Sequence, residues 1–88
     1  MAVNRKHKHQ ATLDRIFARP VSGNVKWGDV EALLRELGAE ITEAEGSRIT
    51  VALFGAVRVF HRPHPRPDTD KGALASVLKW LEDNGVTP

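Results

Sequence analysis

The spacing of apolar residues predicts three helices. Between Gln10 and Ala18 apolar residues recur at helical spacing, and Pro20 ends the segment. A second stripe runs through residues 27–38, where Gly38 suits the left-handed position that follows a helix. A third helix is expected to begin after cap residues at positions 68–70. Its apolar stripe consists of Ala73, Leu74, Val77, Leu78 and Leu81.

Between the second and third helices the apolar pattern changes to a period of two, which is typical of strands. We expect a weak first strand over 39–44, a β-rich second strand over 48–54 and a third strand over 56–61. Turn residues separate these strands at Glu45-Gly46 and at Gly55. The segment that follows, residues 62–67, contains three prolines and is therefore expected to be a loop.

The alternation also assigns side chains to the two faces of the expected sheet. On the second strand Ile49, Val51 and Leu53 share a face, and on the third strand Val57 and Val59 do. We expect the helices to cover one face, because a bare three-stranded sheet has no stable core. The other face would be open to solvent and would carry Arg48, Thr50, Ala52, Arg58, Phe60 and Arg62.

These elements predict an α+β fold, in which helices pack on one face of a three-stranded antiparallel sheet and an extra helix precedes them. A chain of 88 residues has room for one domain. We place it at residues 10–88, after a basic flexible tail at residues 1–9. No apolar run is long enough to span a membrane, and no apolar segment follows the basic start, so we expect a cytoplasmic protein. The absence of cysteine excludes disulfides and thiolate zinc sites.

The charges are unevenly distributed, although the net charge is only +2. Residues 1–27 carry six lysines and arginines against one aspartate, whereas residues 28–46 carry six acidic residues against one arginine. Residues 47–67 carry four arginines and no acidic residue. The basic segments would attract an anionic partner, for which RNA is the first candidate.

Residues 27–85 resemble the HicA family of toxins from toxin–antitoxin systems. Five short pieces carry the resemblance by their order and spacing: a helix ending in Leu37-Gly38, then Glu45-Gly46-Ser47, His64-Pro65, Lys71-Gly72-Ala73-Leu74 and Val77-Leu78. The resemblance implies a fold like a double-stranded RNA-binding domain. It also implies a toxin that degrades mRNA with a histidine and without a metal or other cofactor, and that a HicB-like antitoxin silences.

The chain departs from the family pattern at one position. The family's catalytic histidine follows Gly-Ser, and Arg48 occupies that place here. Arginine can hold a phosphate through two hydrogen bonds, but it is never deprotonated and so cannot act as a general base. Either another histidine has taken over the role, or this chain binds RNA without cutting it.

Metal-free RNA cleavage needs a base, an acid and cations, and histidine suits both proton roles. We predict His64 and His61 as catalytic candidates, although His61 could instead pack at a strand end and His64 cap the proline-rich loop. Ser47 is a further RNA-binding candidate or a plain turn residue, and Phe60 could stack on a base. The remaining predicted RNA contacts are Arg48, Arg58, Arg62, Arg66 and Lys71.

The same residues allow other interpretations of the function. Histidines and aspartates could bind a metal, but the spacings of His61 and His64, and of His7 and His9, match no zinc pattern, so no metal is expected. The leading hypothesis is an RNA-directed toxin that acts as a metal-independent mRNA endoribonuclease and has an antitoxin partner. The alternatives are a non-catalytic RNA-binding module and a protein-interaction domain. The sequence makes no prediction of oligomeric state.

Overall fold

The computed structural model describes residues 7–20, 25–63 and 68–88. Its elements are α1 (His7–Ile16), α2 (Trp27–Glu36), β1 (Glu40–Glu43), β2 (Arg48–Leu53), β3 (Ala56–His61) and α3 (Lys71–Asp83). The predicted α+β fold is confirmed, including the helix that precedes the rest. That helix begins three residues before the predicted Gln10.

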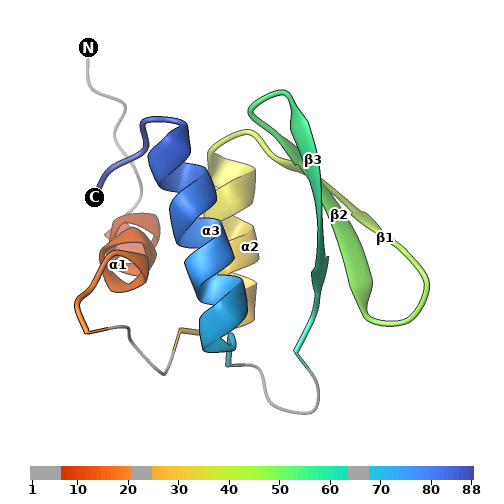
Figure 1. Ribbon diagram of the computed structural model, residues 1–88, viewed down its shortest axis with the longest axis horizontal. Helices are drawn as coiled ribbons and strands as arrows, with labels where there is room; N and C mark the ends of the chain where they lie inside the picture. Colours follow the sequence, from red (N-terminus) through yellow and green to blue (C-terminus); the bar gives the residue numbers. More distant parts are fainter. Residues whose placement is uncertain (1–6, 21–24, 64–67) are drawn as a thin grey trace.

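The elements are stacked in layers (Figure 1). Helices α2 and α3 lie side by side on one face of the antiparallel sheet, whose strand order is β1-β2-β3, and α1 lies on the far side of the helix pair. The core lies between these layers. Its fully buried side chains include Leu13 and Ile16 of α1, Leu33 and Leu34 of α2, Ile49 and Val51 of β2, and Leu74, Val77 and Leu81 of α3.

The ends of the elements follow the local chemistry that the sequence predicts. Asp70 precedes α3, and its side chain accepts a hydrogen bond from the backbone N–H of Ala73 at 2.8 Å, which caps the helix. Gly38, just after α2, has a φ of 105°, a conformation that costs glycine little. Within the described residues, no helix has the length and apolar character needed to cross a membrane.

The β2–β3 turn fixes which face each side chain of β3 occupies. Phe54 and Gly55 both have positive φ, 56° and 72°, so they form a two-residue turn that places Leu53 opposite Ala56. Residues directly opposite each other in an antiparallel pair point to the same side. The register continues with Val51 opposite Arg58 and Ile49 opposite Phe60, so these residues of β3 point toward the helices.

This register corrects the predicted faces of the third strand. Val57 and Val59 do share a face, but it is the open face of the sheet, where they are 65% and 59% exposed. Phe60, expected on the open face, is instead buried in the core. The alternation of apolar residues identified which residues share a face, but it did not identify which face is buried. Phe60 is the largest side chain of the strand and packs with the two tryptophans. Burying its ring stabilises the fold more than burying the two valines would.

Candidate functional site

Arg48 and His61 face each other across two neighbouring strands. Arg48 is the first residue of β2, His61 is the last residue of β3, and the two are direct partners in the register. The backbone N–H of Arg62 donates to the carbonyl of Ser47 at 2.7 Å, so the adjacent Arg48–His61 pair is of the non-hydrogen-bonded kind. In such pairs the Cα atoms lie about 4.5 Å apart and the side chains approach closely.

Both side chains of this pair are exposed on the open face of the sheet. Arg48 donates from Nε to the backbone carbonyl of Glu45 at 3.4 Å, which leaves its terminal nitrogens outside this contact. Among the described residues, no carboxylate lies within ion-pair distance of Arg48 or His61. A guanidinium and an imidazole are thus presented together to solvent, an arrangement suited to holding an anion and moving a proton beside it.

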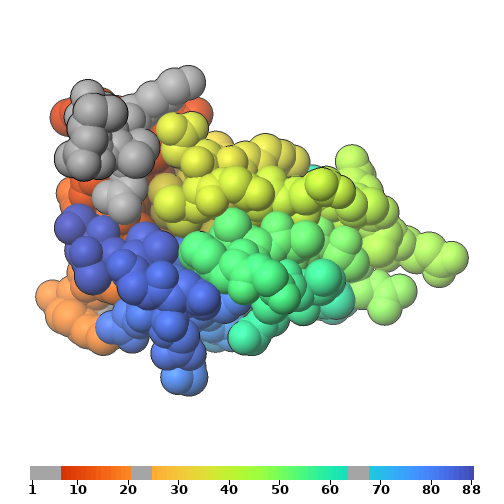
Figure 2. Space-filling view, turned by 90° about the horizontal axis from the view of Figure 1, so that it is seen from above, coloured from red at the N-terminus to blue at the C-terminus, as the bar shows by residue number. Residues whose placement is uncertain are grey.

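The pair lies near a projecting end of the molecule. The turn between β1 and β2, which includes Ser47, extends beyond the helices in the space-filling view (Figure 2). Ser47 is exposed in this turn, one residue before Arg48. The structure therefore brings together three of the predicted site residues, Ser47, Arg48 and His61.

Arg62 does not join them, because acidic side chains hold its guanidinium. It donates two hydrogen bonds to the carboxylate of Glu31 in α2, at 2.9 and 3.1 Å, and forms an ion pair with Glu43 of β1 at 3.2 Å. Arg35 lies 3.6 Å from the same Glu31 carboxylate. These contacts tie the end of β3 to α2 and β1, which is a structural role rather than the open phosphate contact that the sequence suggested.

The buried Glu31 carboxylate is held in its charged form by this network. Burial by itself raises the pKa of Glu31, but the hydrogen bonds and charge of Arg62, together with the charge of Arg35, lower that pKa below 4.5 overall. The same hydrogen bonds raise the pKa of Arg62 above its ordinary value. Sequence reasoning missed Glu31, although a signal was present: it lies four residues after Trp27 and three before Leu34, within the apolar stripe of α2.

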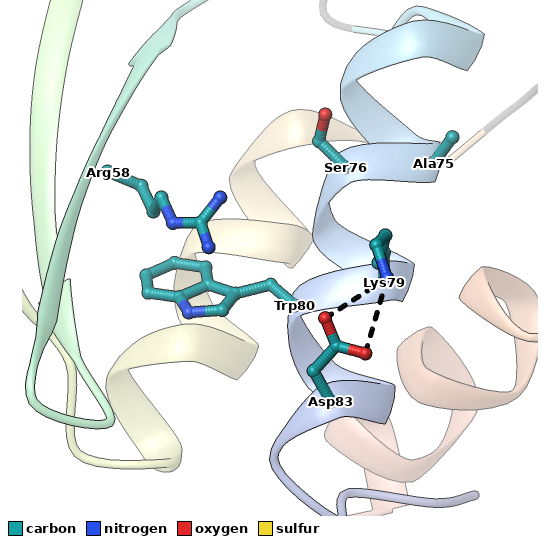
Figure 3. Close-up of a pocket in the computed structure, with 6 residues that line it drawn as sticks. All are labelled: Arg58, Ala75, Ser76, Lys79, Trp80 and Asp83. Atoms are coloured by element: carbon teal, nitrogen blue, oxygen red, sulfur yellow. Dashed lines mark hydrogen bonds and ion pairs between the residues drawn. The ribbon is translucent and has the colours of Figure 1, made fainter.

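Arg58 and Phe60 also lie away from the open face. Phe60 packs between Trp27 and Trp80, with ring centroids 5.6 and 6.2 Å away, so it is a core residue and not a platform for a base. The guanidinium of Arg58 lies over the ring of Trp80, 5.2 Å from its centroid (Figure 3). The expectation that these side chains share a face with Arg48 was therefore wrong, because the β2–β3 register turns them toward α3.

The remaining predicted site residues are separate from the pair or outside the description. Lys71 is exposed at the first turn of α3, a helix on the other side of the sheet from Arg48. His64 and Arg66 lie outside the described residues, so their predicted roles stay predictions. In the described part of the chain, no group of three or more histidine and acidic side chains is placed to hold a metal ion.

Comparison with known proteins relates the chain to one family. The sequence pattern of the family described as the HicA toxin of bacterial toxin–antitoxin systems matches residues 27–83, from the start of α2 to the end of α3. No curated protein and no solved structure matches the chain. The family match covers more than half of the 88 residues and leaves α1 as an extension before it. The chain therefore belongs to the HicA toxin family of bacterial toxin–antitoxin systems.

Proposed function

We propose that this toxin is a metal-independent endoribonuclease that cuts mRNA in the cytoplasm and that a HicB-like antitoxin neutralises. Family membership supports a toxin with a partner antitoxin. The cross-strand pair of Arg48 and His61 supports RNA cleavage, because it presents a cation and a proton-transfer group on one exposed surface. This pair is the single observation on which the proposed chemistry rests.

The pair offers an explanation for the arginine at the family's histidine position. The resemblance places a catalytic histidine after Gly46-Ser47, where this chain has Arg48. His61 stands directly opposite that position on the neighbouring strand. We infer that His61 supplies the catalytic imidazole from the neighbouring strand, on the same patch of surface as the family's histidine position. Arg48, which occupies that position, then serves as the phosphate contact.

The proposed reaction is attack of a ribose 2′-oxygen on the adjacent phosphorus. His61 accepts the 2′-OH proton, the new bond from the 2′-oxygen to phosphorus forms, and the bond from phosphorus to the 5′-oxygen breaks. The products are a 2′,3′-cyclic phosphate and a 5′-hydroxyl, which gains its proton from His64 or from water. Arg48 stabilises the negative charge that builds up on the phosphoryl oxygens in the transition state.

A second candidate function is an RNA-binding module that does not cut. It is favoured by the scarcity of proton-transfer groups on the open face. Arg48 cannot serve as a base, and among the described residues His61 is the one histidine on that face. The two candidates predict the same salt-dependent RNA affinity, so only a cleavage assay separates them.

The test is incubation of the purified chain with a long mRNA in EDTA, using variants of single histidines. The proposal predicts cleavage by the wild-type chain and a loss of about 10²-fold or more in His61→Ala. His7→Ala is the matched control, because His7 is exposed on α1, on the far side of the helix pair from the sheet, and its loss should leave the rate unchanged. His64→Ala tests the leaving-group proton. RNA that is bound but never cut would overturn the nuclease proposal in favour of the binding module.

A further inference from the structure

The outer edge of β3 is an unpaired strand edge. The sheet has the order β1-β2-β3, and within the described residues no strand pairs with the far side of β3. Because the N–H of Arg62 bonds to Ser47, the backbone groups of every second residue before it also point toward β2. The N–H and C=O groups of the alternate residues, Val57, Val59 and His61, therefore point outward.

Two of the open-face side chains beside this edge are apolar. Val57 and Val59 are exposed by 65% and 59% on the open face of the sheet, next to their own unpaired backbone groups. Proteins usually protect an exposed strand edge with charged side chains, proline or a bulge, since it is a template for pairing with another chain. At Val57 and Val59 none of these protections is present, which marks the edge as a place where an extended segment can add.

The helix side of the same edge holds a groove that an added strand would cover (Figure 3). The groove has a volume of about 310 Å³ and is lined by Arg58 of β3 and by Ala75, Ser76, Lys79, Trp80 and Asp83 of α3. A strand paired with β3 would extend the sheet over α3, and every second side chain of that strand would point into this groove.

The charges in the groove indicate what such a side chain would be. Lys79 forms an ion pair with Asp83 at 3.2 Å, whereas Arg58 is stacked on Trp80 without any carboxylate at ion-pair distance among the described residues. An acidic side chain entering the groove would form an ion pair with the guanidinium of Arg58. The stacking on Trp80 already holds that guanidinium in place. A second copy of this chain fits poorly, because β3 contains no acidic residue and a second β3 would bring another arginine.

We propose that the antitoxin adds an extended segment to the outer edge of β3. The segment hydrogen-bonds to the backbone of Val57, Val59 and His61, covers the two valines, and places an acidic side chain against Arg58. This proposal rests on the antitoxin partnership of the proposed function, and it adds the surface, the binding mode and the chemistry of the contacting residue.

The first test is amide hydrogen exchange, residue by residue, in the free chain and in its complex with the HicB-like antitoxin of the proposed function. In the free chain, the outward amides of Val57 and Val59 should exchange much faster than the inward amides of Arg58 and Phe60. In the complex, exchange at Val57 and Val59 should slow by about a hundredfold or more. Outward amides that stay fast in the complex would overturn the proposal.

Two pairs of variants test the backbone and the charge separately. Val59→Pro removes an outward donor without touching a bond to β2, whereas Val59→Thr keeps the donor and serves as its control. Antitoxin affinity should fall about tenfold or more in Val59→Pro and change little in Val59→Thr. Arg58→Gln should weaken binding more than Arg58→Lys, which keeps the charge. Val59→Lys keeps the donor but places a charge at the edge, so it should also weaken binding and tests the same surface if the proline variant melts early.

RNA cleavage by the same variants separates this proposal from the proposed function. Val59→Pro should still cut RNA, since Val59 has no part in the proposed chemistry. Equal antitoxin affinity across all variants would refute the β3 edge as the binding surface and leave the nuclease intact. Failure of the wild-type chain to bind the antitoxin at all would refute the partnership itself, and with it the occupant proposed for this edge.

Discussion

Arg48 and His61 occupy directly opposite positions at one end of the β2–β3 strand pair. Neither residue alone indicates a site, since exposed arginines and histidines are common on protein surfaces. What distinguishes them is their direct opposition across β2 and β3, without a competing carboxylate in the described part of the chain. We therefore propose that they form one site with two functions, a phosphate contact and a proton acceptor.

The proposed role of Arg48 as a phosphate contact predicts a change in salt dependence. Arg48→Ala should weaken RNA binding and reduce the slope of log affinity against log salt concentration by about one unit. Arg48→Lys should largely keep the slope, because it keeps the charge. Filter binding of one RNA at several salt concentrations measures both quantities, and an unchanged slope in Arg48→Ala would remove Arg48 from the interface.

The Glu31–Arg62 pair predicts that acid destabilises the fold. The folded state lowers the pKa of Glu31 below 4.5, so the unfolded chain binds a proton more readily. The stability from this carboxylate is therefore complete well above pH 4.5 and is lost as the pH falls through the lowered value. Glu31→Gln should cost about 2 kcal/mol at pH 7 and should make stability less sensitive to acid.

Urea unfolding at pH 7 and at pH 3.5 measures this effect. The exposed Glu40, for which no ion pair is found among the described residues, supplies the control variant Glu40→Gln, which should keep the acid sensitivity of the wild-type chain. If Glu31→Gln loses as much stability in acid as the wild type, the assigned role of Glu31 is wrong.

At the scale of elements, the sequence predicted each helix and strand found in the described residues but reversed the faces of β3. The stripes of α2 and α3 and the period-two pattern of the strands were sufficient to place these elements. The error came from the turn. The sequence pattern predicts a turn at Gly55 but places Phe54 in the strand, because a Phe-Gly pair is not a familiar two-residue turn. Counting from Leu53 opposite Ala56 would have placed Phe60 in the core.

The corrected faces of β3 predict opposite effects for neighbouring residues. Phe60→Ala should destabilise the fold by about 3 kcal/mol, because it removes the ring that packs between Trp27 and Trp80. Val59→Thr, one position away on the open face, should change stability by no more than about 0.5 kcal/mol. Thermal or urea unfolding of the two variants checks this, and a larger loss for Val59→Thr would restore the face assignment that the sequence suggested.

The candidate site was predictable only in part, for reasons that also lie in the elements. The sequence named Arg48 and His61 separately, but their opposition requires the register, which no local pattern determines. Arg62 was assigned to RNA because its partner Glu31 lies 31 residues earlier in the chain, on a different element. Contacts of this kind become visible only when the tertiary structure brings the elements together.

At the scale of the whole molecule, α1 completes the core of a domain that begins, by family match, at residue 27. Leu13 and Ile16 of α1 are fully buried, and both belong to the same core as α2, α3 and the sheet. The extension is thus part of the fold rather than an appendage. A domain of this size buries only a small core, so the loss of one core contact should lower the stability of the whole domain.

This arrangement predicts one cooperative unfolding transition for the entire chain. Leu13→Ala should destabilise the fold by about 3 kcal/mol, because it leaves a cavity between α1 and the helix pair. Tryptophan fluorescence, which reports on Trp27 and Trp80, and far-ultraviolet circular dichroism should give the same urea midpoint. Separate midpoints, with α1 lost first, would show that the extension folds independently of the family core.

The most direct test of the central claim exchanges the two residues of the site. Single-turnover RNA cleavage in EDTA would be compared among the wild-type chain, His61→Arg and the double variant Arg48→His with His61→Arg. The account predicts that His61→Arg loses cleavage, and that the double variant regains it by returning the histidine to the family position with an arginine opposite. Wild-type cleavage by His61→Arg, or a folded double variant as inactive as His61→Arg, would contradict the claim that this pair is the catalytic site.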